Sequence, residues 1–124
     1  MPKFESADPL TALGLKALLH GPFDRALWEA VASPNLHLRI ANAPPATGRT
    51  AALDALQAFL ARIEGFGCHY CDLWRRREAI YAETDVRFTN REGRLCTIPC
   101  ALVARVTRGQ LQDLRLHLDP SPIP

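Results

Sequence analysis

Three carboxylates and one arginine stand at alternating positions in two neighbouring segments, and this spacing is the first chemical signal in the sequence. They are Asp72 in the segment 68–76, followed by Glu83, Asp85 and Arg87 in the segment 79–89. Two carboxylates held together in a half-buried site cannot both ionise at low cost, so one of them is expected to keep its proton near neutral pH. Such a pair would supply an acid and a base for proton transfer next to a carbonyl group.

Four segments that alternate apolar or aromatic residues with polar ones predict an antiparallel meander. They are 68–76, 79–89, 95–106 and 111–118, and each ends at turn-forming residues. Directly opposed residues in neighbouring antiparallel strands point to the same face. A four-residue turn at 90–93 pairs Thr89 with Arg94 and so places Glu83 opposite Cys100. A three-residue turn at 107–109 places Leu102 opposite Leu114.

The first hairpin completes this predicted face. A two-residue turn at 77–78 places Trp74 opposite Tyr81 and Asp72 opposite Glu83. On this face the first two segments carry polar and aromatic residues, and the last two carry mainly apolar residues. They are Tyr70, Asp72, Trp74, Tyr81, Glu83, Asp85 and Arg87, followed by Cys100, Leu102, Leu114, Leu116 and Leu118. An odd-length turn would exchange the two faces.

The pattern also allows the opposite orientation. Ile80, Ala82, Val86 and Phe88 could form the core face of the second strand. In that case Glu83 and its neighbours are a solvated stripe, whose cross-strand ion pairs contribute little to stability.

Composition indicates a single soluble domain with one core. The chain has 124 residues, 48% of them hydrophobic and 23% charged, and a formal charge of +2. This charge is too small to indicate nucleic-acid binding, and the run 75–77 of three arginines is interpreted as a solvated turn rather than a phosphate-binding patch. No apolar run reaches the roughly 18 residues of a membrane span, and the first residues lack a secretory signal, so a cytoplasmic protein without membrane association is expected.

Cysteine spacing does not favour a metal site. Cys68 and Cys71 lie in one predicted strand and point to opposite faces, and Cys96 and Cys100 lie in a strand that is not adjacent to it. We therefore expect free thiols, with no metal and no cofactor.

Three helices and one strand precede the meander. Asp8-Pro9 predicts a helix start, and Gly21-Pro22 predicts its end. A second helix is predicted over about 24–32, a strand over 36–40 and a third helix over about 49–64. The proline-rich end, 119–124, is expected to be an extended tail. The result is an α+β domain over 1–124, with three helices packed on a curved mixed sheet.

The order of several short motifs resembles the SnoaL-like branch of the nuclear-transport-factor-2-like superfamily, which includes ketosteroid isomerases, limonene epoxide hydrolases and polyketide cyclases. The motifs are Pro44-Pro45-Ala46-Thr47-Gly48-Arg49, Asp72-Leu73-Trp74, the segment 83–93 and the segment 111–122. The resemblance implies a cone-shaped fold whose sheet encloses a deep apolar pocket, and a homodimer formed through the convex sheet face. It also implies that Glu83, Asp85, Arg87, Cys100, Leu102, Leu114, Leu116 and Leu118 line that pocket.

The catalytic residues of these relatives are not conserved in type. The position of the ketosteroid isomerase base corresponds to Arg39, and that of the acidic oxyanion donor to Leu102. Of the epoxide hydrolase set, Asp85 is retained, Glu83 replaces the arginine, and Leu116 replaces the second aspartate.

Two functions are therefore kept open. The first is a cofactor-independent isomerase, lyase or hydrolase. In it Asp85, Glu83 and Asp72 perform acid–base chemistry, Arg87 and Arg39 stabilise an oxyanion, and Tyr70, Trp74 and Tyr81 hold an apolar carbonyl substrate. The second is a non-catalytic homodimeric module that binds a small apolar molecule or supports assembly. Its convex face would carry Leu73, Val86, Phe88, Ala101 and Val103.

Overall fold

In the part of the chain that the structure describes, two helices precede the first strand and a third follows the second strand. The computed structural model describes residues 11–67 and 72–124. The helices are α2 (Ala12–His20), α3 (Arg25–Val31) and α4 (Arg49–Leu60). The Thr11 side chain accepts a hydrogen bond from the Gly14 N–H at the start of α2, and Asp24 accepts from the first N–H groups of α3. The predicted helix start at Asp8-Pro9 lies outside the described residues.

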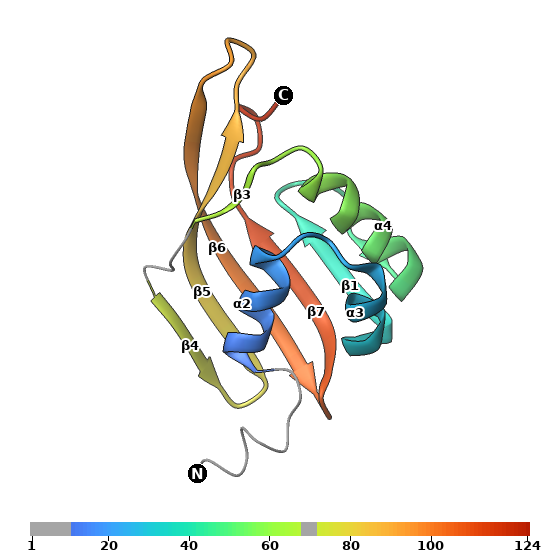
Figure 1. The fold of residues 1–124 in the computed structure, drawn as a ribbon. Helices are drawn as coiled ribbons and strands as arrows, with labels where there is room; N and C mark the ends of the chain where they lie inside the picture. Colours follow the sequence, from blue (N-terminus) through green and yellow to red (C-terminus); the bar gives the residue numbers. More distant parts are fainter. Residues whose placement is uncertain (1–10, 68–71) are drawn as a thin grey trace.

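Seven strands form one mixed sheet in the order β2-β1-β7-β6-β5-β3, with β4 also paired to β5 (Figure 1). The strands are β1 (Ala32–Ile40), β2 (Ala46–Thr47), β3 (Gly65–Phe66), β4 (Asp72–Arg76), β5 (Ala79–Thr89), β6 (Leu95–Thr107) and β7 (Gln110–His117). Only the β1–β7 pair is parallel within this described sheet. The predicted α+β class, with helices on a curved mixed sheet and a C-terminal meander, is confirmed.

The helices cover one face of the sheet, and the core lies between them (Figure 1). Leu15 of α2, Trp28 of α3 and Leu53 of α4 are each at most 1% exposed. They pack with the inward residues of the sheet, which are Leu36, Leu38, Ile80, Ala82, Val86, Phe88, Cys100, Leu102, Ala104, Val106, Leu111, Leu114 and Leu116. Burial alternates along β5 and β6, as expected for strands with one covered face.

The first hairpin has the predicted register and the second does not. Asp72 lies opposite Glu83 and Trp74 opposite Tyr81, as predicted. Thr89, however, lies opposite Leu95 rather than Arg94, because the turn contains five residues, 90–94. The Asn90 side chain holds this longer turn by accepting hydrogen bonds from the N–H groups of Glu92 (3.0 Å) and Arg94 (2.9 Å). The predicted four-residue turn is therefore wrong, and the odd length exchanges the faces of β5 relative to β6.

The third hairpin differs from the prediction in its turn and pairing, but not in the face to which its side chains point. Its turn is the two-residue Arg108-Gly109, both with positive φ, as in a type I′ turn. A register shift between Arg105 and Val106 then restores the predicted faces, so that Leu102 lies opposite Leu116 on the buried side.

The C-terminal residues return to the core rather than extending from it. Ile123 is 5% exposed and belongs to the hydrophobic core, and its N–H donates to the Pro120 carbonyl at 2.9 Å. Arg62, just after α4, donates to the carbonyls of Ile123 and Pro124, each at 3.2 Å. Across the described ranges, no helix combines the length and apolarity needed to cross a bilayer.

Candidate functional site

Three of the four predicted catalytic residues lie on the outer face of the sheet, away from the helices. Glu83 and Asp85 are exposed and lie opposite Ala101 and Pro99 of β6. Arg87 is half-buried on the same face. The prediction that they line a pocket beneath the helices is wrong, because the five-residue turn places the alternate residues of β5 in the core.

The predicted pocket residues divide between the two faces. Trp74, Tyr81 and Arg39 are exposed or half-buried, and Trp74 stacks on Tyr81 with a ring centroid distance of 5.4 Å. Cys100, Leu102, Leu114 and Leu116 are buried among the core side chains, and Leu118 packs against them. The structure therefore does not bring the polar and apolar halves of the predicted site together. Tyr70 lies outside the described residues.

The covered interior offers little acid–base chemistry. Of the described residues, Ser33 and Thr84 alone are buried and polar by side chain. Thr84 donates weakly to the Asp85 carbonyl at 3.5 Å, and Ser33 accepts from the Asn35 N–H at 3.1 Å. The acid–base pair proposed from Asp72 and Glu83 has the predicted register, but its Glu83 member is solvated. The half-buried environment that the pair requires is therefore missing.

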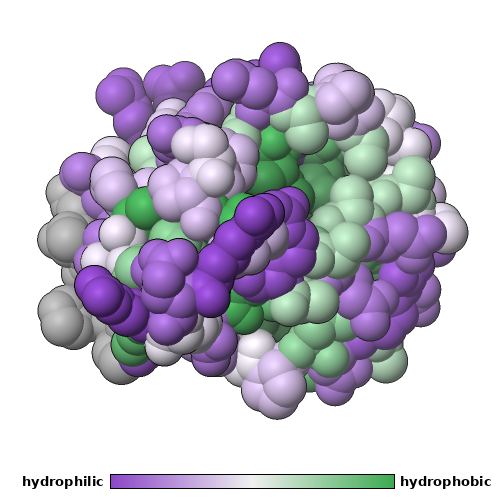
Figure 2. All heavy atoms as spheres, turned by 90° about the horizontal axis from the view of Figure 1, so that it is seen from above, coloured by the Kyte–Doolittle hydropathy of each residue, from purple (hydrophilic) through white to green (hydrophobic). Residues whose placement is uncertain are grey.

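A hollow of about 330 Å³ lies where the C-terminal ends of α2 and α4 approach β3. Its apolar lining includes Leu19, Phe23, Leu60 and Ile63, and its polar lining includes His20, Gln57 and Glu64. In Figure 1 the upper ends of α2 and α4 lie near β3, below the turn that joins β5 to β6. Seen from above, apolar residues gather near the centre of the view, between hydrophilic ones (Figure 2). This combination of apolar walls with a few polar groups is typical of a small-molecule site.

Two polar groups of this hollow have defined surroundings. His20 is half-buried, and its burial, together with the positive charge of Lys16, lowers the pKa of its imidazole. The ring is thus neutral at pH 7, with one nitrogen able to donate and the other able to accept. The Glu64 carboxylate accepts a hydrogen bond from the Thr89 hydroxyl at 3.0 Å, which ties the hollow to the end of β5.

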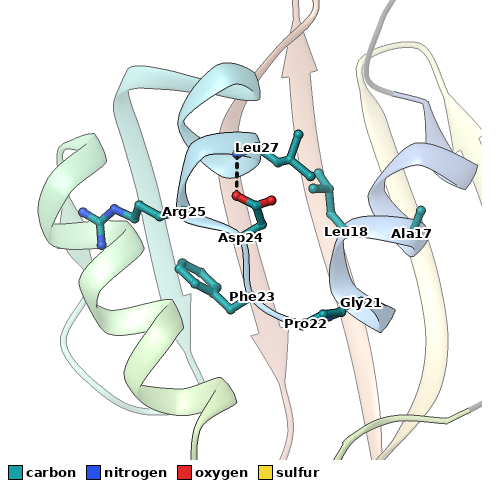
Figure 3. Close-up of a pocket in the computed structure, with 8 residues that line it drawn as sticks. All are labelled: Ala17, Leu18, Gly21, Pro22, Phe23, Asp24, Arg25 and Leu27. Carbon is teal, nitrogen blue, oxygen red and sulfur yellow. Dashed lines mark hydrogen bonds between the residues drawn. The ribbon is translucent and has the colours of Figure 1, made fainter.

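A second groove, of about 510 Å³, lies between α2 and α3 (Figure 3). Leu18 and Leu27 face it from the two helices, and the turn with Gly21, Pro22 and Phe23 connects it to the hollow above. Leu27 is 55% exposed. On its far side Arg25 binds Asp54 of α4 at 2.7 Å, which fixes α3 against α4.

Sequence analysis did not identify the residues of the hollow. Leu60 and Ile63 fall within the third helix predicted over about 49–64, with no role given to them there. The available signal was that a polar residue occurs in the last turn of both helices, His20 before Gly21 and Gln57 before Ala61, where two helix ends could meet. Within the described residues no three His, Cys, Asp or Glu side chains are grouped as a metal site would require, and the predicted free thiols at Cys68 and Cys71 lie outside those residues.

Comparison with solved structures identifies the architecture. Three of the similar structures are a protein described as a SnoaL-like polyketide cyclase from Jannaschia sp. CCS1, an NTF2-like protein of unknown function from Burkholderia pseudomallei K96243, and TerC co-crystallised with polyporic acid. Their TM-scores are 0.66, 0.66 and 0.65, at 11%, 16% and 10% identity. The matches cover 77%, 79% and 79% of this chain, and 72%, 80% and 81% of those chains.

The chain has the NTF2-like fold. No protein-family model matches it, and no curated protein matches its sequence. At these identities the likeness establishes the arrangement of helices and strands and not the chemistry. In this chain the face of the sheet towards the helices carries the described core side chains, which pack against those of the helices.

Proposed function

We propose that this NTF2-like protein is a non-catalytic module that binds a small, largely apolar molecule in the hollow between the ends of α2 and α4. The observation that carries the proposal is the lining of this hollow. Leu19, Phe23, Leu60 and Ile63 supply apolar contact, and neutral His20 can satisfy one polar group of a ligand. The ligand class is a compact, uncharged molecule with one hydroxyl or carbonyl group.

A binding role is favoured over the enzymatic alternative by the positions of the carboxylates. Glu83 and Asp85 are exposed on the face that the helices do not cover. A general acid or base must lie within hydrogen-bonding reach of its substrate, and these groups lie on the other side of the sheet from the hollow. That TerC was co-crystallised with polyporic acid supports ligand binding by this fold in general terms.

Assembly as a homodimer through the convex face stays a prediction, but part of the apolar surface expected there is buried in the core. Val86 and Phe88, which were to contribute to that face, are at most 1% exposed in the core. The outer face instead carries Glu83, Asp85, Arg105 and Arg115 as exposed residues.

The hollow can be tested by filling it from its rim. Ala61 is exposed and lines the hollow, so Ala61→Trp should obstruct it without disturbing the core. The matched control is Ala58→Trp, an exposed position of α4 outside the lining. Neutral naphthol and tetralone serve as probes, and binding is followed by backbone amide NMR shifts.

We expect a dissociation constant of about 4 mM for these probes, since each has about 11 non-hydrogen atoms and a ligand contributes roughly 0.3 kcal/mol per non-hydrogen atom. The shifts should map to residues 19–23 and 60–65, persist in Ala58→Trp and disappear in Ala61→Trp. Shifts centred elsewhere, or binding that survives Ala61→Trp, would overturn the proposal.

A further inference from the structure

The turns of two hairpins lie side by side at one end of the sheet and bring separate arginines together. The first turn is Arg77-Glu78, between β4 and β5, and the second is Arg108-Gly109, between β6 and β7. The Val106 N–H donates to the Glu78 carbonyl at 2.7 Å, which fixes one turn beside the strand that leads to the other. Both turns lie at the lower end of the sheet (Figure 1).

A hollow of about 440 Å³ opens between these strands. It is lined by Arg76, Arg77, Glu78, Ala79, Tyr81 and Arg105, and so by three guanidinium groups and one carboxylate. Arg105 lies opposite Ala79 in the sheet, which places it across the hollow from the first turn. Considering the residues that the structure describes, none of the three arginines takes part in an ion pair. Unpaired guanidinium groups in a concave site create a positive potential that attracts anions.

An aromatic surface adjoins this charge. Tyr81 lines the hollow, and its ring is stacked on Trp74 with an interplanar angle of 18°. Trp74 is 43% exposed, although large aromatic side chains are usually buried, so much of its ring is open to a partner. Exposed aromatic rings stack with flat ligands, and a base on an aromatic side chain contributes roughly 1–3 kcal/mol.

We propose that this hollow binds a small organic phosphate that carries a flat aromatic ring, the chemistry of a mononucleotide, which revises the expectation that the run 75–77 is a solvated turn and not a phosphate-binding patch. Arg76 and Arg105 bind the phosphate through the paired N–H groups that suit its oxygens, and the ring lies on the Tyr81 and Trp74 surface. A hollow of this size accommodates one such molecule. A long nucleic acid would need many phosphate contacts, and the chain has a net charge of only +2. The site lies apart from the α2–α4 hollow, and no residue lines both.

The proposal is tested by titration with adenosine monophosphate at low salt, followed by tryptophan fluorescence. The chain has two tryptophans, and Trp28 is fully buried, so a change reports on Trp74. Arg76→Gln/Arg105→Gln removes the phosphate contacts. The matched control is Arg91→Gln/Arg94→Gln, which removes the same charge from exposed positions in the turn at the other end of β5.

The wild type and the control variant should bind with similar affinity, and Arg76→Gln/Arg105→Gln should bind at least about tenfold more weakly. Adenosine lacks the phosphate and ribose phosphate lacks the aromatic ring, so both should bind more weakly than the nucleotide. Raising the salt concentration should weaken binding of the nucleotide but not of adenosine. As a second variant, Trp74→Ala should reduce the affinity for the nucleotide to that for ribose phosphate, measured by calorimetry.

Equal affinity of the Arg76→Gln/Arg105→Gln variant and the control would overturn the proposal. So would binding of adenosine as tightly as of its phosphate, or binding of an oligonucleotide with none of the mononucleotide, which would indicate a nucleic-acid surface instead.

Discussion

Thr84 lies directly opposite Cys100 across β5 and β6, and both side chains are buried beneath the helices. Their neighbours Glu83 and Asp85 therefore project from the other face of the sheet. The register of this pair therefore determines that apolar residues, and not the carboxylates of β5, face the interior.

The orientation of β5 predicts that substitutions at two adjacent positions differ strongly in their effect on the free energy of unfolding. Glu83→Ala removes a solvated carboxylate and should change the free energy of unfolding by at most about 0.5 kcal/mol. Ala82→Glu places a charge among core side chains and should cost at least about 3 kcal/mol. Urea denaturation measures both variants. If Ala82→Glu were tolerated and Glu83→Ala were not, the faces described for β5 would be reversed.

Sequence analysis predicted the elements well, because their signals are local. Alternation in 79–89, the second helix predicted from about 24 and the stop at Gly21-Pro22 each depend on neighbouring residues, and each is found in the structure. The alternative core face with Ile80, Ala82, Val86 and Phe88, derived from pattern alone, is confirmed.

The candidate site failed on a feature that sequence signals specify weakly. Asn90 and Gly93 mark a turn, but they do not reveal that Arg94 is included in it through the Asn90 side chain. One additional residue in a turn exchanges every side chain between the two faces of the following pairing. The first hairpin was predicted correctly with a turn that lacks glycine, and its Arg77 adopts a φ of 53°.

The lowered pKa of His20 predicts a loss of stability in mild acid. In the unfolded chain the imidazole has its ordinary pKa of about 6.5, whereas burial lowers the pKa in the folded state. The unfolded state therefore binds the proton more tightly. The contribution is fully present above pH of about 6.5 and is lost as the pH falls through the folded-state pKa.

Thermal unfolding of the wild type and of His20→Gln across this pH range checks the prediction. The difference between the two proteins should depend on pH only below about 6.5. His117→Gln, which replaces a histidine at an exposed position of β7, is the matched control. Parallel curves for the wild type and His20→Gln would contradict the prediction.

The two cysteines on β6 should differ in reactivity. Burial raises the pKa of the Cys100 thiol to about 12, so almost no thiolate forms at pH 8, whereas Cys96 is only half-buried. In a Cys68→Ser/Cys71→Ser background, a disulfide reagent should modify Cys96 in the folded protein and Cys100 only after unfolding. Mass spectrometry of the labelled protein distinguishes the two, and rapid labelling of Cys100 in the folded protein would contradict its described burial.

The C-terminal turn predicts that a terminal residue stabilises the fold. Ile123→Ala should reduce the free energy of unfolding by about 2 kcal/mol, because the side chain belongs to the core. Leu95→Ala is the matched control, since this leucine is 55% exposed, and it should cost at most about 0.5 kcal/mol. Equal losses in the two variants, measured by chemical denaturation, would show that Ile123 contributes no more than a surface residue.

The parallel pairing of β1 with β7 has a consequence for biosynthesis. Residues 32–40 have their main sheet partner at 111–116, so β1 cannot complete this pairing until the segment 111–116 has been made. A ribosome adds roughly 5–20 residues per second, and until residues 111–116 emerge this strand can pair only with the two-residue β2. Productive folding of the sheet therefore requires that residues 32–116 have all been made, and contacts this distant in sequence slow it.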